Sequence, residues 1–268
     1  MNGALEGKTI VVTRAVDQAE ELIALLKGTG AEVIHLPVIK IVEPKSWVAF
    51  DREAARIDVY DWVIFSSANA VRFFCNRLKS LNGSPFVLND IRNAAVGERT
   101  KAALNDFGVH VELIPGLFTA EGLVEEFSKK SIVGSRILIP RGQAGRDVLC
   151  DGLKALGARV QSVEIYRNQP IVNRNSAEYR QLLNASHVDV LTFTSPSTVR
   201  NFIELFGGAK IRSWVARGCE LAVIGDITAS ALLTHGLQSS IAPFKSTIPD
   251  LVSAIVKQMT NPERCPVH

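Results

Sequence analysis

Hydroxyl groups, glycines and arginines follow several short apolar runs of the sequence. Thr13 and Arg14 follow the first run, Ser66 and Ser67 follow another, and Gly97 follows a third. In open parallel sheets, ligands bind beyond the carboxyl ends of the strands, where helices that begin there present unpaired backbone N–H groups to anions. Arginine side chains add bidentate contacts to the same anions. These residue types therefore predict a site for a small anionic molecule.

The same pattern occurs twice in the sequence. Segment 8–14 (KTIVVTR) returns 127 positions later as segment 135–141 (SRILIPR), and segment 65–72 (FSSANAVR) returns 128 positions later as segment 193–200 (FTSPSTVR). A repeat at a fixed spacing indicates that one structural unit is present in two copies. The candidate ligand-binding residues of both copies are Thr13, Arg14, Ser66, Ser67, Asn69, Gly97, Thr100, Arg141, Gly142, Thr194, Ser195, Gly225 and Thr228.

These candidates also have purely structural interpretations. Gly97 and Gly225 could serve only close packing at a strand-to-helix turn. The hydroxyl residues could be helix N-caps, a role that Ser and Thr fill in many α/β proteins. A cap and an anion site use the same helix N-terminus, so both interpretations stay open. The residues for which capping is the alternative are Ser66, Thr100, Thr194 and Thr228.

Tyr166 is the candidate catalytic residue. It lies in segment 163–170 (VEIYRNQP), and the residue 127 positions earlier is the aliphatic Ile39. A tyrosine in place of an aliphatic residue on an extended strand could direct a phenol into the site. The alternative is an amphipathic residue that packs across neighbouring strands.

The cysteines and histidines form no recognisable metal motif. Cys75, Cys150, Cys219 and Cys265 lie far apart, and no two histidines are four positions apart, so we expect no metal. Neither copy carries GxGxxG, GxxxxGK[ST] or GxSxG, which argues against dinucleotide binding, P-loop chemistry and a hydrolase nucleophile.

The composition excludes several classes of protein. Among 268 residues, 47% are hydrophobic and 21% charged, which indicates a folded chain. The net charge is +3 and the basic residues are scattered, so we expect neither a nucleic-acid partner nor a polybasic membrane surface. No apolar run approaches the roughly 18 residues of a membrane span. The first residues show no secretory pattern, which predicts a cytoplasmic location.

β-branched runs alternate with amphipathic helical segments, which predicts parallel sheets covered by helices. In the first copy the expected strands are 8–13, 32–43, 61–66, 93–97 and 109–114, and the expected helices are 17–28, 69–80, 99–107 and 120–129. The predicted fold class is α/β, with two flavodoxin-like, doubly wound lobes from an internal duplication. Segment 32–43 and its counterpart, which ends at Pro170, exceed the usual strand length of about six residues. We expect their far halves to form a two-stranded antiparallel ribbon that joins the lobes.

The ordered set of motifs resembles the uroporphyrinogen-III synthase family over roughly residues 7–257. The resemblance rests on VTR at 12–14, FSSANAV at 65–71, AVG at 95–97 with Thr100, IPRG at 139–142, Tyr166 with Pro170, FTSP at 193–196, and IG at 224–225 with Thr228. Each motif is weak alone, whereas their order and spacing together are specific. Pro140 stands where the first copy has Thr13, so equivalent roles for Arg14 and Arg141 do not follow.

The resemblance implies a discontinuous first lobe of residues 1–36 and 171–268, a second lobe of residues 45–162, and a ribbon of residues 37–44 and 163–170. It implies that hydroxymethylbilane, a linear tetrapyrrole with eight carboxylates, binds in a cleft between the lobes. The implied reaction is loss of the terminal hydroxyl, attack to a spiro intermediate, inversion of the last pyrrole ring and closure. No cofactor or metal is implied. By position, Tyr166 matches the tyrosine proposed to assist departure of the hydroxyl, and Thr100 and Thr228 match threonines of the family's cleft.

The expected partner is thus a small molecule bound by a monomer, with only transient contact with the preceding or following pathway enzymes. An alternative is a hinged two-lobe binding or sensor protein for a polycarboxylate ligand. A tandem receiver protein is less consistent with the residues, because receiver strands end in acidic side chains and these end in Thr, Ser and Gly.

Overall fold

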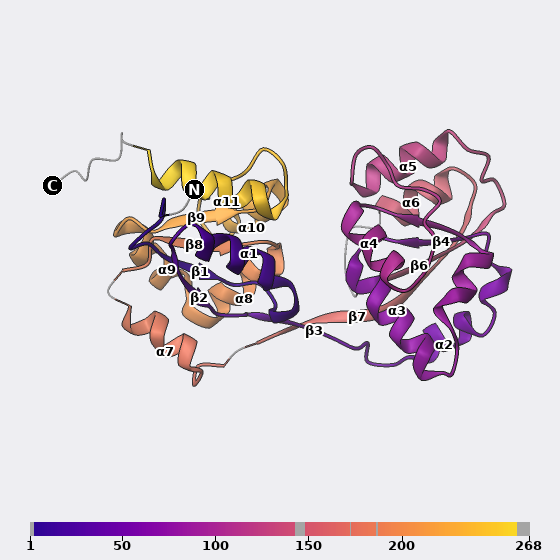
Figure 1. Cartoon of the computed structure of the whole chain (residues 1–268), viewed down its shortest axis with the longest axis horizontal. Coiled ribbons are helices and arrows are strands. Elements are labelled where there is room, and N and C mark those ends of the chain that lie inside the picture. Colours follow the sequence, from indigo (N-terminus) through magenta and orange to yellow (C-terminus); the bar gives the residue numbers. More distant parts are fainter. Residues whose placement is uncertain (1–2, 143–147, 172, 186, 262–268) are drawn as a thin grey trace. The chain divides into compact units, whose positions relative to one another are not determined.

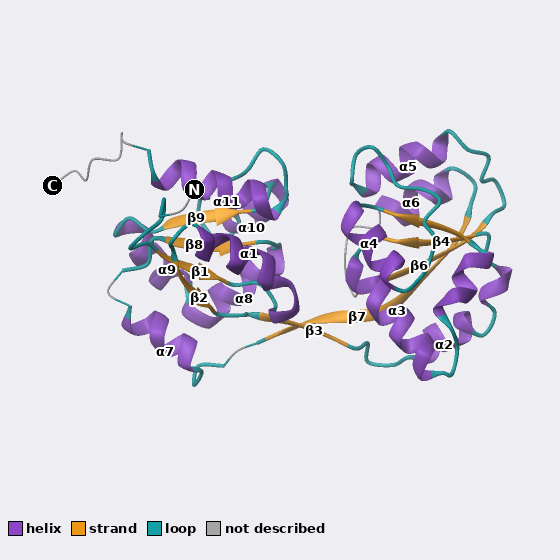
Figure 2. Cartoon of the chain, in the orientation of Figure 1, coloured by secondary structure: helices purple, strands orange, loops and turns teal. Residues whose placement is uncertain are grey.

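The computed structural model describes residues 3–142, 148–171, 173–185 and 187–261. The chain divides into two compact units: unit 1 comprises Met1–Lys40 and Gln169–His268, and unit 2 comprises Ile41–Asn168. Unit 1 is therefore assembled from both ends of the chain. Each unit has an α/β fold in which helices lie on both faces of a sheet (Figures 1 and 2).

The sheet of unit 1 has the strand order β2-β1-β8-β9. The strands are β1 (Thr9–Val12), β2 (Glu32–His35), β8 (Val190–Phe193) and β9 (Glu220–Val223). All three neighbouring pairs are parallel. A single parallel bridge between Ala222 and Ile241 extends the sheet beyond β9. The carboxyl ends of β1, β8 and β9 consequently lie at one edge of this sheet.

The sheet of unit 2 has the strand order β3-β7-β6-β4-β5. Its strands are β3 (Ile39–Val42), β4 (Trp62–Phe65), β5 (Arg92–Ala95), β6 (Arg136–Gly142) and β7 (Arg159–Pro170). β7, β6, β4 and β5 run parallel, and a bridge joins Ala94 to Leu113. In each unit, strands from one sequence copy thus pair with strands from the other: β1 with β8, and β6 with β4.

Helices cover both faces of the two sheets. Unit 1 contains α1 (Val16–Gly28), α7 (Ala177–Asn184), α8 (Pro196–Phe206), α9 (Gly208–Ala216), α10 (Asp226–Leu233) and α11 (Ile248–Met259). Unit 2 contains α2 (Val48–Ala54), α3 (Ala68–Ser80), α4 (Glu98–Asp106), α5 (Ala120–Ser128) and α6 (Val148–Ala155), with 3-10 turns at Ile57–Val59 and Pro85–Asp90. Within the described ranges, none of the helices combines the length and apolar character needed to span a bilayer.

The strands are apolar on both faces, which is why each sheet needs two layers of helix. In β1, Val11 packs with the cluster that includes α8 and α9, whereas Ile10 and Val12 pack with the cluster formed by α1 and α11. In β4, Val63 and Phe65 face α3, and Trp62 and Ile64 face α5 and α6. The alternating directions of neighbouring strand residues thus supply a core on each side of the sheet.

Two predicted strands are corrected by the structure. Segment 32–43 forms two strands, β2 and β3, because Pro37 lies between them and has no N–H group for a ladder hydrogen bond. The position 127 residues later is Glu164, and there β7 runs without interruption. Segment 109–114 contributes one bridge at Leu113, because the N–H groups of Glu112 and Leu113 both donate to the Asn93 carbonyl in place of a regular ladder.

Candidate functional site

The candidate residues lie at the carboxyl ends of the parallel strands. The sequence predicts this location, because these residues follow apolar runs that are expected to form strands. They form one group in each unit, and we describe each group separately. The unit 1 edge comprises Thr13, Arg14, Thr194, Ser195, Gly225 and Thr228. The unit 2 edge comprises Ser66, Ser67, Asn69, Gly97, Thr100, Arg141, Gly142 and Tyr166.

Two serines cap helices at these edges, Ser67 and Ser195, so the capping hypothesis for the preceding residues Ser66 and Thr194 is wrong. The Ser67 Oγ accepts a hydrogen bond of 3.2 Å from Ala70 N at the start of α3. The Ser195 Oγ accepts one of 3.2 Å from Thr198 N at the start of α8, and the Thr198 Oγ1 accepts one of 3.3 Å from Ser195 N. Each side chain thereby satisfies one N–H group of its helix, and the positive end of the helix dipole remains at the edge.

Two glycines begin the other helices of the edges. Gly97 precedes α4 and Gly225 precedes α10, and neither helix start has a capping side chain. Thr100 N and Thr228 N each donate 3.0 Å hydrogen bonds to the carbonyl of the glycine three residues earlier. The capping hypothesis for Thr100 and Thr228 is therefore wrong. Their side chains are buried inside the first helical turn, with residue exposures of 5% and 3%.

The Thr13 side chain is committed to the sheet. Thr13 is fully buried, and its hydroxyl donates a 2.7 Å hydrogen bond to the Thr192 carbonyl. The Thr192 hydroxyl in turn donates to the Val11 carbonyl at 2.9 Å. Asn69 is also buried, with 7% exposure in the first turn of α3. The hydrogen bond of Thr13 therefore stabilises the backbone position from which the Arg14 side chain extends.

The two edge arginines have different surroundings. Arg14 Nε lies 3.4 Å from the Gln18 Oε1, and the Arg14 carbonyl accepts a 2.9 Å hydrogen bond from the His35 Nε2. Arg141 Nη1 lies 3.9 Å from the Cys150 Sγ on α6. The difference parallels the sequence, where Pro140 replaces the repeated Thr13. Both residues are partly exposed, so both retain surface that can meet an anion.

Tyr166 lies at the unit 2 edge and contacts two residues of the α3 region. Its hydroxyl oxygen is 3.2 Å from the Ser67 Oγ. Its ring is stacked on Phe73, with ring centroids 5.7 Å apart and an angle of 26° between the planes. Gly142 is its partner across β6 and β7. The structure therefore joins Tyr166, Ser67 and Gly142, three residues that the sequence nominated independently.

Two exposed phenylalanines lie in loops beside the edges, and the sequence did not single them out. Phe118 is 57% exposed and packs beside Gly97. A Cβ atom added to Gly97 would lie 3.5 Å from the Cβ atom of Phe118. Phe244 is fully exposed, two residues before Ser246, whose hydroxyl packs against Gly225. The repeat marks these loops through Pro115 and Pro243, but exposure of the rings cannot be read from spacing.

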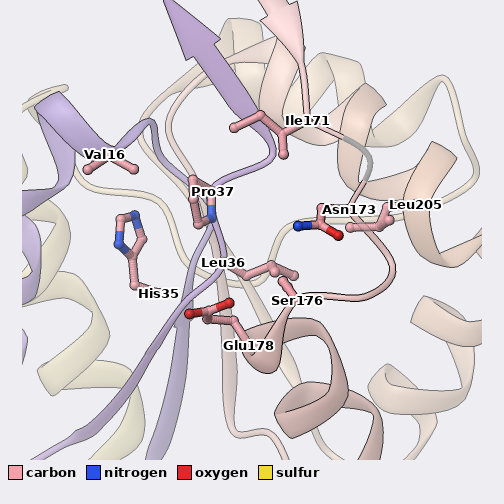
Figure 3. A pocket seen from close by; sticks show the side chains of 9 residues that line it. All are labelled: Val16, His35, Leu36, Pro37, Ile171, Asn173, Ser176, Glu178 and Leu205. Atoms are coloured by element: carbon pink, nitrogen blue, oxygen red, sulfur yellow. The ribbon is translucent and has the colours of Figure 1, made fainter.

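A pocket of about 260 Å³ lies in unit 1 at the end of β2 (Figure 3). Leu36, Pro37 and Leu205 give it apolar walls, and His35 and Glu178 give it polar groups. The glutamate comes from α7, more than 140 positions from the histidine in sequence, so no local motif could have revealed the pocket. Among the described side chains, no three His, Cys, Asp or Glu groups gather as a metal site would require.

Comparisons with known proteins agree with one another. A family model described as "Uroporphyrinogen-III synthase HemD" matches residues 20–253. The uroporphyrinogen-III synthase of Synechococcus elongatus is 36% identical over 232 residues, which cover 84% of this chain and 85% of that protein. A putative uroporphyrinogen-III synthase of Methanothermobacter thermautotrophicus is 30% identical over 254 residues, 93% of this chain and 98% of that protein.

The fold has relatives among solved structures as well. A crystal structure of a mutant uroporphyrinogen III synthase from Thermus thermophilus aligns with a TM-score of 0.63 and covers 94% of this chain and 98% of that chain. The corresponding structure from Helicobacter pylori aligns with a TM-score of 0.62 and covers 94% and 99%. At 19% and 17% identity these likenesses concern the fold alone.

Proposed function

The chain belongs to the uroporphyrinogen-III synthase family, and from this premise we propose how its two edges perform the reaction. Family membership makes the chain a lyase of tetrapyrrole biosynthesis. The proposed substrate is hydroxymethylbilane, which loses its terminal hydroxyl as water, closes through a spiro intermediate and inverts its last pyrrole ring. The observation that carries this proposal is the pair of edges, each built from helix N-termini and one arginine-bearing strand end.

The edges suit a ligand with many carboxylates. We propose that N–H groups at the starts of α3, α4, α8 and α10 bind carboxylates, with Arg14 and Arg141 adding charge-assisted contacts. Thr100 and Thr228 are buried behind two of these helix starts, which supports a role in fixing the turns. The proposed carboxylate-binding turns are formed by Ser66, Ser67, Asn69, Gly97, Gly142, Thr194, Ser195 and Gly225.

Tyr166 is the proposed proton donor. The phenol gives its proton to the departing hydroxyl of the substrate, the carbon–oxygen bond breaks with its electron pair on oxygen, and water leaves. When the ring closes, the pyrrole carbon that forms the new bond loses one proton. This proton returns to the phenol oxygen, so the reaction balances. Transfer of a proton to a leaving group by a positioned side chain contributes about 10²- to 10⁴-fold in rate. Holding the ends of the chain in the geometry for inversion is the larger task of the enzyme.

The substrate also has four pyrrole rings, which need apolar contacts. We propose that Phe118 and Phe244 contact the faces of these rings, because both aromatic side chains are exposed beside turns that present N–H groups. An aromatic pair stabilises by about 0.5–1.5 kcal/mol beyond the burial of its surface. These contacts would account for exposed aromatic residues that no core cluster uses.

We infer that the two units arose by internal duplication. Equivalent positions support this: Ser67 and Ser195 are both N-caps, and Thr119 and Thr247 cap α5 and α11. The order β2-β1-β8-β9 fits the flavodoxin-like sequence 2-1-3-4 for strands within one unit. The proposed lobes are residues 1–36 with 171–268 and residues 45–162. Residues 37–44 and 163–170 form the proposed antiparallel ribbon, in which β3 is the neighbour of β7.

We propose that the chain acts in the cytoplasm as a monomer, meeting the enzymes that supply its substrate and consume its product only transiently. The alternative of a hinged binding or sensor protein has no observation in its favour, whereas four relatives named above carry the synthase name. Incubation with hydroxymethylbilane, followed by isomer analysis of the oxidised products, tests the reaction itself.

The binding role of the edges has its own test. Arg14→Gln and Arg141→Gln remove one charge from each edge, and each should raise KM for hydroxymethylbilane about threefold to tenfold by weakening a carboxylate contact. Arg217→Gln is the control, since the side chain of this exposed arginine donates to the Ser213 carbonyl in the last turn of α9. An unchanged KM in both edge variants would show that these arginines do not bind the substrate.

A further inference from the structure

We propose that Gly142, Phe73 and Ser67 are positioning residues that hold the Tyr166 phenol for proton transfer. The inference rests on the proposed role of Tyr166 as proton donor, and all four residues belong to unit 2. Each of the three touches a different part of the tyrosine: the backbone of Gly142 meets the ring edge, Phe73 meets the ring face, and Ser67 meets the hydroxyl.

Gly142 leaves room for the tyrosine ring. A Cβ at this position would lie 2.6 Å from Cε2, 2.7 Å from Cζ and 3.1 Å from the hydroxyl oxygen of Tyr166. Real Cβ atoms do not approach other atoms so closely, so any side chain here would displace the ring. The glycine also sits at a register shift, where Arg141 pairs with Glu164 and Gly142 pairs with Tyr166. An irregularity of this kind redirects a side chain at the end of a strand.

Phe73 and Ser67 both belong to the α3 region and act on the same tyrosine. The Phe73 ring is stacked on the phenol ring of Tyr166, with ring centroids 5.7 Å apart, and this contact restricts the orientation of the phenol ring. Ser67 is the N-cap of α3 and Phe73 lies in its second turn, so a rigid helix carries both contacts. The phenol is thus held between α3 on one side and β6 on the other.

The Ser67 hydroxyl can support proton transfer while it caps the helix. One of its lone pairs accepts from Ala70 N, which leaves the O–H group free to donate to the Tyr166 oxygen 3.2 Å away. With Ser67 as donor, the phenol proton points away from the serine and can pass to the departing hydroxyl. The same O–H group and the positive end of α3 then stabilise the negative charge left on the phenol oxygen.

The repeat provides an internal comparison. At the corresponding positions, 127 or 128 residues away, the chain has Ile39 for the tyrosine, Ala15 for the glycine and Asn201 for the phenylalanine. The Asn201 side chain donates to the Val38 carbonyl at 3.0 Å and serves the backbone there. Of the four positions, only that of the N-cap serine has the same residue in both copies, because Ser67 corresponds to Ser195. The glycine and the aromatic residue thus occur at the positions that accompany the phenol in unit 2, whereas the counterparts of these positions are Ala15 and Asn201.

The test is a set of double-mutant cycles on the whole chain, with kcat and KM for hydroxymethylbilane measured separately. Tyr166→Phe should lower kcat at least about tenfold. Gly142→Ala should lower kcat about fivefold to twentyfold, and Ser67→Ala about threefold to tenfold, with KM changed less than about twofold. In the Tyr166→Phe background, neither second substitution should lower kcat by more than about twofold, because no phenol remains to be misplaced.

Ser176→Ala controls for loss of a helix cap. Ser176 caps α7 in unit 1, as Ser67 caps α3 in unit 2. This variant should lose about as much thermal stability as Ser67→Ala and keep the wild-type kcat. The proposal is contradicted if Gly142→Ala keeps full kcat, or if Gly142→Ala and Ser67→Ala lower kcat by equal factors in both backgrounds. A fully active Tyr166→Phe that still makes the type III isomer overturns this inference and the role of Tyr166 but leaves the proposed reaction standing, whereas a wild-type chain that makes no type III isomer overturns the proposed reaction.

Discussion

The Thr13 hydroxyl donates a 2.7 Å hydrogen bond to the carbonyl oxygen of Thr192, which lies 179 positions later in the sequence. The bond joins the residue that follows β1 to β8, and these strands come from different copies of the repeat. A unit built from the two ends of the chain therefore depends on side-chain as well as backbone bonds between them. Lys8 adds an ion pair of 3.0 Å to Asp189 at the start of β8.

Thr13→Val should lower the free energy of unfolding by about 1–2 kcal/mol, because the substitution keeps the buried shape but removes the donor to Thr192. Urea unfolding followed by circular dichroism measures the effect. Thr260→Val is the matched control, since its hydroxyl bonds the Val256 carbonyl at the exposed end of α11. Its effect should stay below about 0.5 kcal/mol. Equal effects of the two substitutions would contradict a special role for the bond between β1 and β8.

Glu53 should make the stability of unit 2 dependent on pH in the acid range. The residue is fully buried and accepts hydrogen bonds from Tyr60, Arg56 and Arg52 at 2.7, 2.7 and 3.0 Å. Burial raises the pKa of the carboxyl, but these three hydrogen bonds outweigh it and hold the pKa below the usual value of 4.5. Burial and the carboxylate together raise the pKa of the Tyr60 phenol to about 12, so it stays a donor to Glu53 well into the alkaline range.

Because the pKa of Glu53 is lower in the folded than in the unfolded chain, its charge stabilises the fold above about pH 4.5, and this contribution is lost as the pH falls through the lowered pKa. Glu53→Gln should lower the free energy of unfolding at pH 7 by about 1–2 kcal/mol, and the difference from wild type should shrink below pH 4.5. Urea titrations between pH 3.5 and about 8 measure both, with exposed Glu20→Gln as control. A difference independent of pH would contradict the assignment.

Phe244→Ala should raise KM for hydroxymethylbilane about threefold to tenfold, because it removes an exposed ring, two residues before the Ser246 that packs against Gly225, that we expect to contact a pyrrole. The melting temperature should not change, since the side chain is fully exposed. Steady-state kinetics and a thermal melt measure the two effects. Val133→Ala, at an exposed position before β6, should change neither quantity. A wild-type KM for Phe244→Ala would remove this ring from the substrate site.

The buried cysteines should be unreactive in the folded chain. Burial raises the pKa of the Cys75 and Cys219 thiols to about 12, and Cys150 is buried in the contact between α6 and its sheet. At pH 8 almost no thiolate is available to attack a disulfide reagent. In a Cys265→Ala variant, Ellman's reagent should react slowly with the native chain and rapidly with three thiols in guanidinium chloride. A thiol that reacts within seconds in the native chain would contradict this burial.

The strands and helices with strong apolar patterns could be predicted from the sequence to within one or two residues. β4 was expected at 61–66 and lies at Trp62–Phe65, and α3 was expected at 69–80 and lies at Ala68–Ser80. Helix α2 was missed because it has only seven residues and its segment lacks a clear period, although Phe50 anchors it in the core. Local pattern identifies elements that bury a whole face, but short elements depend on the tertiary site that receives them.

The candidate site was predictable as a set of turns but less so as a set of side chains. Strand ends of one parallel sheet must meet at one edge, so the repeat located the turns that contain Ser67 and Ser195. It placed the possible caps at Ser66 and Thr194, one residue before the actual caps, and it did not show that the Thr13 hydroxyl bonds Thr192. Those facts depend on distances between strands far apart in sequence. The exposed ring of Phe244 was missed because the spacing of the repeat carries no information on exposure.

The conversion of hydroxymethylbilane is the most direct test of the account. The purified chain is incubated with this substrate, the products are oxidised, and the type I and type III isomers are separated by chromatography. The account predicts mainly the type III isomer, formed far faster than the type I isomer appears in a control without enzyme. Type I product alone, at the rate of that control, would contradict the proposed reaction.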